Sequence, residues 1–274
     1  MTVIQSIILG IIQGITEFLP ISSSGHLVIV PYLLGWDIPD TEAFVFNVLV
    51  QVASLFAVIF YFWSELLEIG KEMWAGLLNK SPLNSEKSRL GWLLILATIP
   101  AGLIGFILRS LVKQAFASPI IVAFSLLLTA GLLLLAEVSG KRTKRINQID
   151  WWDSLWIGLF QVLAVFPGVS RSGATISAGM MRDLKRPESA RFAFLMSVPI
   201  MLAAGLSATY DLIQLPNILD LILTFLPGFI SSAIAGYISI RWLLKYLAKN
   251  PLIFFALYCA ALSIFIIVFY LINI

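Results

Sequence analysis

The sequence predicts an all-α integral membrane protein built from two copies of one unit. Hydrophobic residues make up 59% of the 274 residues and charged residues 12%, and several apolar runs approach the 20 or so residues that a membrane-spanning helix needs. The short alternating segments that build a membrane β-barrel are missing from the sequence. Residues 6–25 also match residues 154–173 at a constant offset of 148, without a gap. Together these observations predict one membrane domain of two similar halves.

The two copies share seven identical positions, whereas composition alone would give about one or two. The identical pairs are Ser6/Ser154, Gly10/Gly158, Gln13/Gln161, Phe18/Phe166, Ser22/Ser170, Ser24/Ser172 and Gly25/Gly173. The copies differ at positions that carry chemistry. Only the first has Glu17, Ser23 and His26, and the second places Arg171 opposite Ser23.

Six apolar segments are long enough to span a membrane, three in each half. They are residues 43–63, 90–108, 119–137, 188–209, 222–244 and 252–272. Each set of three follows two shorter apolar runs, which are residues 3–16 and 26–36, and residues 154–166 and 174–181. Runs this short are more often re-entrant than spanning, and the prolines at positions 20 and 167 interrupt a helix there. Each half is therefore predicted to be a re-entrant helix–loop–helix hairpin followed by three transmembrane helices, with inverted topology between the halves.

The rest of the chain connects these elements. Residues 64–80 are predicted to form an amphipathic surface helix, followed by a loop at 81–88. Repeat one is assigned to residues 1–137, a basic cytoplasmic linker to 138–150 and repeat two to 151–274.

Two further features of the sequence limit the class of protein. No lysine or arginine precedes Lys71, so the first apolar segment is expected to belong to the fold and not to a cleaved signal peptide. Cys259 is the only cysteine, which excludes a disulfide framework and a thiolate metal site.

Counting segments gives a topology that the charges can test. We call the side of the membrane that holds the N-terminus side X and the opposite side Y. The first hairpin enters from X and returns to X, and three spans then lead to Y. The second hairpin enters from Y and returns to Y, and three more spans lead back to X. Of the 18 lysines and arginines, 15 fall in loops assigned to Y, while Arg109 and Lys113 fall in loops assigned to X and Arg171 in neither. Cytoplasmic loops carry the excess of basic residues, so Y is predicted to be cytoplasmic and both termini outside. The inverted hairpins would then bring their Ser/Gly loops together inside the membrane.

Three ionisable residues lie in unusual places for a membrane protein. Glu17 is the only acidic residue well inside a hydrophobic segment, His26 is the only histidine, and Arg171 is the only basic residue that falls in none of the loops on either side. A charge at the centre of a bilayer helix costs roughly 2.5–3.5 kcal/mol on insertion scales, so such residues are functional by default. An ion pair of Glu17 with Arg171 that only locks the halves together is the structural alternative. The serines, Gln13 and Thr175 nearby favour a binding site.

The two Ser/Gly loops have the groups that bind phosphate. Each offers hydroxyls and backbone N–H groups just before a short helix, where the helix dipole favours an anion. Arg171 adds a guanidinium fork that matches two phosphate oxygens. The predicted phosphate-binding residues are Ser22, Ser24, Gly25, Ser170, Arg171, Ser172, Gly173 and Thr175.

Residues 13–26 (QGITEFLPISSSGH) and 167–175 (PGVSRSGAT) resemble the two signature motifs of the undecaprenyl-diphosphatase (bacitracin-resistance) family, and the resemblance covers nearly the whole chain. It implies a multi-pass enzyme of the bacterial inner membrane that removes the terminal phosphate of undecaprenyl diphosphate, a polyprenyl lipid. This reaction regenerates the lipid carrier of peptidoglycan synthesis. The resemblance also implies an active site that opens to the outer side. The residues that match the family's functional positions are Glu17, Ser23, His26, Ser170, Arg171 and Thr175.

The same resemblance bears on a metal ion. In that family the first motif opens with Glu or Gln, and here the opening residue is Gln13, which shares a helix face with Glu17. One carboxylate and one amide are too few for an all-protein cage. The expected cofactor is therefore a divalent cation, Mg²⁺ or Ca²⁺, held by Glu17 and Gln13 and partly by the substrate's own phosphates.

Hydrolysis of a diphosphate needs stabilisation of charge on the phosphate oxygens and a positioned nucleophile. Arg171 and the loop N–H groups would stabilise the charge. Ser23, activated by Glu17 or His26, is the leading candidate for the nucleophile, since the repeat places it opposite the arginine. Attack by His26 itself and direct attack by water are the alternatives. The predicted catalytic residues are Glu17, Ser23, His26 and Arg171.

Two other functions share some of these features. Fragments such as SSSGH also occur in type-2 phosphatidic acid phosphatases, but those enzymes use two histidines and this chain has one. Inverted repeats with broken helices are also the architecture of secondary transporters. A lipid-phosphate flippase or anion transporter is therefore the alternative function.

The expected partners are membrane lipids and the lipid substrate, and not nucleic acid. The basic cluster at residues 141–145 lies in a short cytoplasmic link, where topology signals and contacts with anionic lipids are typical. Faces rich in Gly and Ala, at 203–205 and 233–236, allow close helix packing within one chain or between two. A homodimer is therefore an open alternative.

Overall fold

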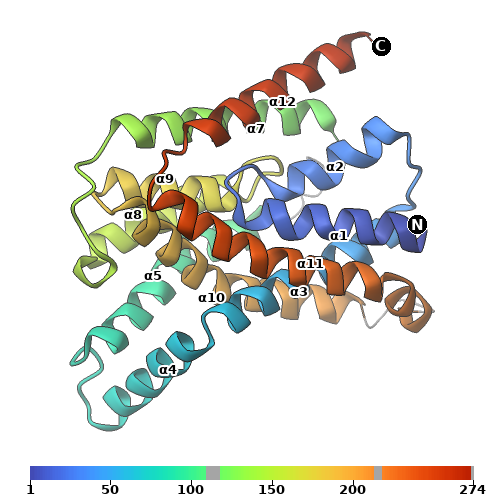
Figure 1. The fold of residues 1–274 in the computed structure, drawn as a ribbon. Coiled ribbons are helices and arrows are strands. Elements are labelled where there is room, and N and C mark those ends of the chain that lie inside the picture. The colour runs from blue at the N-terminus through green and yellow to red at the C-terminus, as the bar shows by residue number, and fades with distance from the viewer. Residues whose placement is uncertain (109–117, 213–217, 273–274) are drawn as a thin grey trace.

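The computed structural model describes residues 1–108, 118–212 and 218–272, and this part of the chain is a bundle of helices (Figure 1). The side chains of residues 207–212 and of residue 220 are also outside the description. The helices of the first half are α1 (Val3–Phe18), α2 (Ser23–Leu34), α3 (Asp40–Tyr61), α4 (Trp63–Leu78), α5 (Glu86–Ile107) and α7 (Pro119–Val138). A short 3₁₀ turn η1 (Ile146–Gln148) precedes α8 (Trp151–Leu163), α9 (Arg171–Met181), α10 (Arg186–Leu212), α11 (Ile218–Leu247) and α12 (Ile253–Ile272).

Six of the described helices are long and apolar enough to cross a membrane, which confirms the predicted integral membrane class. They are α3, α5, α7, α10, α11 and α12, and each overlaps one of the six predicted spans. The pairs α1/α2 and α8/α9 are shorter, as the interrupted apolar runs predicted. Two residues used in the charge count, Arg109 and Lys113, lie outside the described residues.

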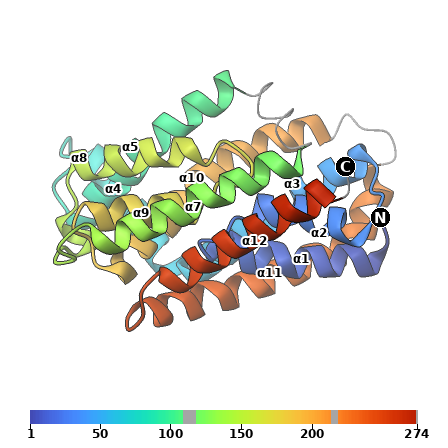
Figure 2. The same ribbon diagram turned by 90° about the horizontal axis from the view of Figure 1, so that it is seen from above.

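The packing partners of the helices follow the order of the repeat. Contacts in one half have counterparts in the other when the helices are matched in chain order. The matched pairs are α1 with α8, α2 with α9, α3 with α10, α5 with α11, and α7 with α12. Thus α1 packs on α11 while α8 packs on α5, and α3 packs on α11 while α10 packs on α5. The matched helices α7 and α12 lie side by side across one face (Figure 2). Matching contacts in the two halves are expected from a duplicated unit. The inverted topology of the two halves across the membrane stays a prediction.

Local sequence explains where the short helices begin and end. Helix α1 stops at Phe18 because Leu19 adopts an extended conformation before Pro20. Helix α2 begins after Ser22, whose hydroxyl accepts the N–H of Gly25 at 3.1 Å. Helix α9 begins in the same way after Ser170, which caps Gly173 at 3.0 Å. Capping serines thus place both Ser/Gly loops at helix N-termini.

Some predicted boundaries are wrong by a few residues. The loop predicted at 81–88 ends earlier, because the Ser85 hydroxyl caps Ser88 and α5 begins at Glu86. The apolar run 154–166 corresponds to a helix that begins at Trp151, capped by Asp150, and ends at Leu163. A prediction from hydropathy omits the first turn of a helix when that turn is polar. Capping side chains and the helix dipole nevertheless favour polar and acidic residues in the first turn.

The basic linker is held by two buried carboxylates. Asp153 at the start of α8 accepts hydrogen bonds from Lys144 at 2.9 Å and Arg182 at 2.6 Å. Glu137 at the end of α7 accepts from Arg186 and from the N–H of Leu252 at the start of α12. Burial raises the pKa of the Asp153 carboxyl, but the hydrogen bonds from Lys144 and Arg182 outweigh it and hold the pKa below its ordinary value. The contact of Lys144 with Asp153 and an ion pair of Arg142 with Glu137 tie the linker to α8 and α7, while the other contacts of Glu137 tie α7 to α10 and α12.

Asp153→Asn is expected to lower thermal stability at neutral pH by about 1–3 kcal/mol, because hydrogen bonds to a charged group are lost. A carboxyl with a lowered pKa in the folded protein stabilises the fold above its unfolded pKa of about 3.9, and this contribution disappears as the pH falls through the folded pKa. The difference in melting temperature between wild type and variant should therefore be largest near pH 7 and shrink below about pH 4. A difference that grows at acid pH would contradict this account.

Glycines let α1 approach α11 and α8 approach α5. A methyl group on Gly10 would collide with the carbonyl oxygen of Gly228, and one on Gly158 with the carbonyl oxygen of Ala97. Gly10 and Gly158 are matched positions of the repeat. The first helix of each hairpin thus lies against the backbone of a longer apolar helix, a contact that only small residues permit.

Gly10→Ala is expected to destabilise the protein by about 1–3 kcal/mol through overpacking. Gly131→Ala in α7 is the matched control, since no atom lies within 4 Å of the added methyl group and alanine is the better helix former. Thermal unfolding in detergent can be followed with a thiol-reactive fluorophore, because the single cysteine, Cys259, is buried. Equal melting temperatures for the two variants would show that the close packing of α1 on α11 at Gly10 does not contribute to stability.

Candidate active site

The two Ser/Gly loops contact each other, as the sequence predicted. The Ser24 hydroxyl accepts the N–H of Gly168 at 3.2 Å, and the Ser172 hydroxyl donates to the carbonyl of Leu19 at 3.1 Å. Ser24 and Ser172 are matched positions, so each loop uses the same serine to hold the break of the other hairpin. The loops therefore form one structural unit from residues about 148 apart in sequence.

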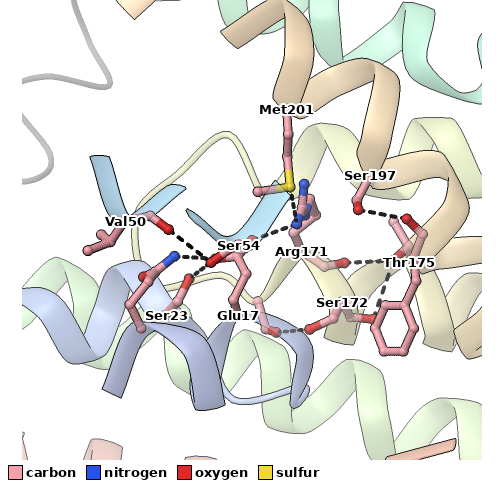
Figure 3. Close-up of polar contacts among 12 residues, drawn as sticks. Glu17, Ser23, Val50, Ser54, Arg171, Ser172, Thr175, Ser197 and Met201 are labelled. Carbon is pink, nitrogen blue, oxygen red and sulfur yellow. Dashed lines mark hydrogen bonds and ion pairs between the residues drawn. The ribbon is translucent and has the colours of Figure 1, made fainter. Parts of the chain in front are cut away.

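Glu17 is the centre of a buried polar cluster. Its Oε2 accepts hydrogen bonds from the Ser23 hydroxyl at 2.5 Å and from Gln13 Nε2 at 2.8 Å. Its Oε1 accepts from Arg171 Nη2 at 2.5 Å. The side chain of Glu17 is only 7% exposed, and burying its charge costs free energy. The three hydrogen-bond donors compensate for this cost. Figure 3 shows Glu17 and Ser23 from the first hairpin facing Arg171 from the second.

Arg171 is placed to bind a further anion. Among the described residues, its contacts with Glu17 and with the Met201 sulfur, at 3.4 Å, both use Nη2. The remaining guanidinium N–H groups can therefore donate to a ligand, and the side chain is 20% exposed. The first-turn N–H groups of a helix have no acceptor within the helix, so those of Ser23 and Ser24 in α2 can also donate to an anion.

A pocket of about 190 Å³ opens beside this cluster. The predicted site residues that line it are Glu17, Ser23, Ser24, Ser170 and Arg171. The rest of its wall is formed by Thr16, Gln51, Ala164, Val165, Pro167, Val169, Ile200, Met201 and Ala204. The pocket therefore has room for a phosphate-sized group.

Other predicted phosphate-binding residues lie behind the pocket wall. Ser22, Ser172 and Thr175 are buried, and their hydroxyls already serve the loops and helices. The Ser22 hydroxyl caps α2, and the Thr175 hydroxyl donates to the Arg171 carbonyl at 2.8 Å, which steadies the first turn of α9. Gly25 and Gly173 supply the capped N–H groups. Their direct contact with phosphate stays a prediction.

His26 does not reach Ser23 or Glu17. Its Nδ1 lies 2.7 Å from the carbonyl oxygen of Ser22, and its Nε2 lies 2.7 Å from the Tyr258 hydroxyl of α12. The imidazole is 6% exposed, and it is absent from the residues that line the pocket. The Ser23 hydroxyl therefore has Glu17 as its partner, and His26 is engaged in a separate contact.

The side chains around Glu17 provide only part of what a metal ion needs as ligands. Gln13 Nε2 donates to Glu17, while Gln13 Oε1 is buried and has no hydrogen-bond partner among the described residues. No group of three or more His, Cys, Asp or Glu side chains within residues 1–108, 118–212 and 218–272 is arranged to hold a metal. The amide nitrogen and not the oxygen of Gln13 faces Glu17, and Gln13 is absent from the described residues that line the pocket. A cation held by these two residues would need the amide to turn over and would need further oxygen ligands.

Several pocket residues were missed by the sequence analysis. Gln51 of α3 reaches the pocket from inside a predicted span, and an amide in a span could have indicated it. Met201 contacts Arg171 from α10, and nothing in its local sequence distinguishes it from a lipid-facing methionine. Tyr258 lies outside the pocket, and no local pattern in the sequence indicated its contact with His26, because it lies in an apolar helix more than 200 residues away.

The six spanning helices and the buried Ser–Glu–Arg cluster define a multi-pass membrane protein with a small polar pocket suited to an anionic group. Comparison with known proteins narrows this class: residues 6–265 match the family described as bacitracin resistance protein BacA, and the chain belongs to that family. A protein of Thermomicrobium roseum named undecaprenyl-diphosphatase is 40% identical over 271 residues, covering 96% of both chains. A protein of the same name from Chloroherpeton thalassium is 39% identical over 278 residues, covering 97% of this chain and 96% of its own.

Proposed function

We propose that this protein is an undecaprenyl-diphosphatase that hydrolyses undecaprenyl diphosphate to undecaprenyl phosphate and inorganic phosphate, and so recycles the lipid carrier of peptidoglycan synthesis. Family membership and the name of the relatives support the substrate. The observation that carries the chemistry is the Glu17 carboxylate, which binds the Ser23 hydroxyl through one oxygen and Arg171 through the other. A nucleophile, its base and a phosphate-binding cation thus meet at one pocket.

The size of the pocket agrees with a lipid headgroup. About 190 Å³ is below the roughly 300–1,000 Å³ of pockets that enclose a drug-sized ligand. The terminal phosphate would enter between the loops and bind Arg171 and the first-turn N–H groups of α2. The prenyl tail would remain outside, along the apolar helix surfaces.

In the proposed reaction Glu17 Oε2 takes the proton of Ser23 as the Ser23 oxygen attacks the terminal phosphorus. The bond from that phosphorus to the bridging oxygen breaks, and undecaprenyl phosphate leaves. The departing undecaprenyl phosphate takes up the proton from Glu17. Water then attacks the phosphoserine, Glu17 accepts a proton from the water, the bond from phosphorus to the Ser23 oxygen breaks, and that proton returns to the Ser23 oxygen as inorganic phosphate is released. Arg171 binds the oxygens of the transferred group throughout, where negative charge is spread in the transition state.

The 2.5 Å contact of Ser23 with Glu17 supports serine as the nucleophile, because His26 lies outside the pocket wall and binds Tyr258. Quenching the reaction in acid distinguishes the alternatives, since phosphoserine survives acid and phosphohistidine does not. Trapped phosphoserine would support Ser23. An acid-labile adduct would favour His26, and the absence of any adduct would favour direct attack by water.

A divalent cation, Mg²⁺ or Ca²⁺, is proposed as a cofactor that binds with the substrate. Gln13 Oε1 and Glu17 would be its protein ligands, and the diphosphate oxygens would complete its coordination. When bound it would neutralise phosphate charge. Activity should be lost with a chelator and recovered with added cation, whereas full activity in the chelator would contradict a metal requirement.

The proposed location is the bacterial inner membrane, with both termini outside and the pocket open to the outer side. A Ser24→Cys variant in a Cys259→Ala background tests this, because Ser24 lines the pocket. A membrane-impermeant thiol reagent should label intact cells from the outside. Labelling only after the cytoplasmic face is exposed would reverse the proposed orientation.

Purified protein in detergent tests the function itself. Release of inorganic phosphate from undecaprenyl diphosphate is expected under these conditions, where no separate compartments exist. A flippase or anion transporter would bind the lipid but release no phosphate.

A further inference from the structure

The hydrogen bonds of His26 determine where its proton lies. A carbonyl oxygen can only accept, so Nδ1, which lies 2.7 Å from the Ser22 carbonyl, must carry a hydrogen. In the neutral ring Nε2 is then an acceptor, and the Tyr258 hydroxyl at 2.7 Å donates to it. Both nitrogens of the only histidine are therefore engaged, and one tautomer is selected.

Tyr258 is held in place by its own helix. The next residue, Cys259, directs its thiol toward the carbonyl of Pro20 at 3.7 Å, within the break of the first hairpin. One turn further, Ser263 donates to the carbonyl of Ala123 in α7 at 2.6 Å. The imidazole and phenol rings are also nearly parallel, with centroids 5.8 Å apart and planes at 6°. Helix α12 thus presents the phenol to His26 in a fixed position.

The chain of contacts continues to the proposed nucleophile. Ser22 has a φ of 70°, a left-handed conformation that is unfavourable for a serine and that persists only where the surroundings impose it. His26 binds the Ser22 carbonyl through both its side chain and its backbone N–H. That carbonyl belongs to the peptide bond that joins Ser22 to Ser23, so its orientation sets the direction of the Ser23 side chain.

We propose that Tyr258 is a positioning residue of this active site. Its hydroxyl fixes the Nδ1–H tautomer of His26, and His26 in turn holds the strained Ser22–Ser23 peptide so that the Ser23 hydroxyl meets Glu17. The inference rests on the proposed function for its catalytic part. It assigns His26 a supporting role and gives the second half of the chain, through α12, a direct part in setting the nucleophile of the first.

The test uses the full-length protein in detergent at pH 8, labelled with ¹⁵N-histidine and freed of any affinity tag, so that all imidazole signals come from His26. The wild type is expected to show a protonated Nδ1 and a hydrogen-bonded, unprotonated Nε2. Tyr258→Phe keeps the ring and removes the hydroxyl, so the Nε2 resonance should shift. Tyr32→Phe is the control, since Tyr32 also joins α2 to α12 through a ring contact with Phe269.

Phosphate release by the same proteins tests the catalytic part. Per folded molecule, Tyr258→Phe should lower kcat about tenfold, the effect expected for loss of one buried hydrogen bond. KM should change less than about twofold, because Tyr258 does not line the pocket. Tyr32→Phe should change neither quantity.

Each outcome decides a separate part of the proposal. An unchanged Nε2 resonance in Tyr258→Phe would overturn the pairing, and an unchanged kcat with a shifted resonance would overturn the positioning role. If the wild type itself released no phosphate, the proposed function and the catalytic role of Tyr258 would both fail, while the spectrum would still decide the pairing. If kcat fell by the same factor in Tyr258→Phe and Tyr32→Phe, the cause would be weaker packing of α12 in general, and the positioning role of Tyr258 would be overturned.

Discussion

Arg171→Ala is expected to reduce phosphate release by at least about 10³-fold, the lower end of what an arginine contributes to phosphoryl transfer. Arg171 is the only basic residue among the described residues that line the pocket, and part of its guanidinium is free to bind a phosphate group. Arg171→Lys should recover only a small part of the activity, because an ammonium group cannot offer two parallel hydrogen bonds. Rates of phosphate release at saturating substrate provide the measurement.

A matched control separates catalysis from folding in this prediction. Removing the arginine alone leaves Glu17 as a buried charge with one fewer donor, which by itself destabilises a protein. The double variant Arg171→Met with Glu17→Gln replaces both charges by neutral groups of similar size, and its fold should therefore be kept. If the pair only locks the two halves, the double variant will be active; we expect a stable protein without activity. Arg145→Ala, at an exposed linker position, should behave as the wild type.

Ser23→Ala is expected to lower phosphate release by at least about 10³-fold, and no acid-stable phosphoenzyme should form. The physical reason is the loss of the attacking oxygen, since the Ser23 hydroxyl is the group that Glu17 holds at 2.5 Å. Glu17→Gln should have a similar effect, because an amide cannot take the serine proton. Ser23→Ala removes a single oxygen, so its melting temperature should change little, whereas Glu17→Gln leaves Arg171 without its charged partner and should lower the melting temperature.

Ser24→Ala is the comparison variant for Ser23. Ser24 is adjacent in sequence and lines the same pocket, but its hydroxyl contacts the Gly168 N–H and not Glu17. Its loss removes one hydrogen bond between the loops, so activity should fall by about tenfold or less. Equal losses for Ser23→Ala and Ser24→Ala would indicate that both serines only bind phosphate, and water would then be the better candidate for the nucleophile.

The sequence predicted the helices and the charged members of the cluster because both depend on local features. A run of about 20 apolar residues must form a helix in a membrane, since its backbone polar groups have no other partners there. Glu17 and Arg171 could be selected because a charge inside an apolar segment is costly unless it has a function or a partner. The helix boundaries were predicted less well, as at Glu86, where capping groups and not hydropathy decide the first residue.

The relation between His26 and Ser23 shows the limit of this reasoning. The two residues are three apart at the start of α2, a spacing that permits a shared site. The structure turns the imidazole toward Tyr258 instead, and leaves Glu17 as the partner of the serine. Residues such as Gln51 and Met201 join the pocket because α3 and α10 pack beside the hairpins, and no local pattern records that packing.

The sequence by itself determined that this is a helical membrane protein with two similar segments, each with one Ser/Gly loop, and with polar residues divided unequally between them. Composition, segment length and internal repetition are properties of the chain, and they persist whatever its tertiary arrangement. Only the tertiary structure decided which groups meet: that Glu17 joins Ser23 to Arg171, that the two loops exchange serine contacts, and that α12 supplies a hydroxyl to His26. Such contacts form only when the two polar atoms lie about 2.5–3.2 Å apart, and how the helices pack decides which atoms come this close.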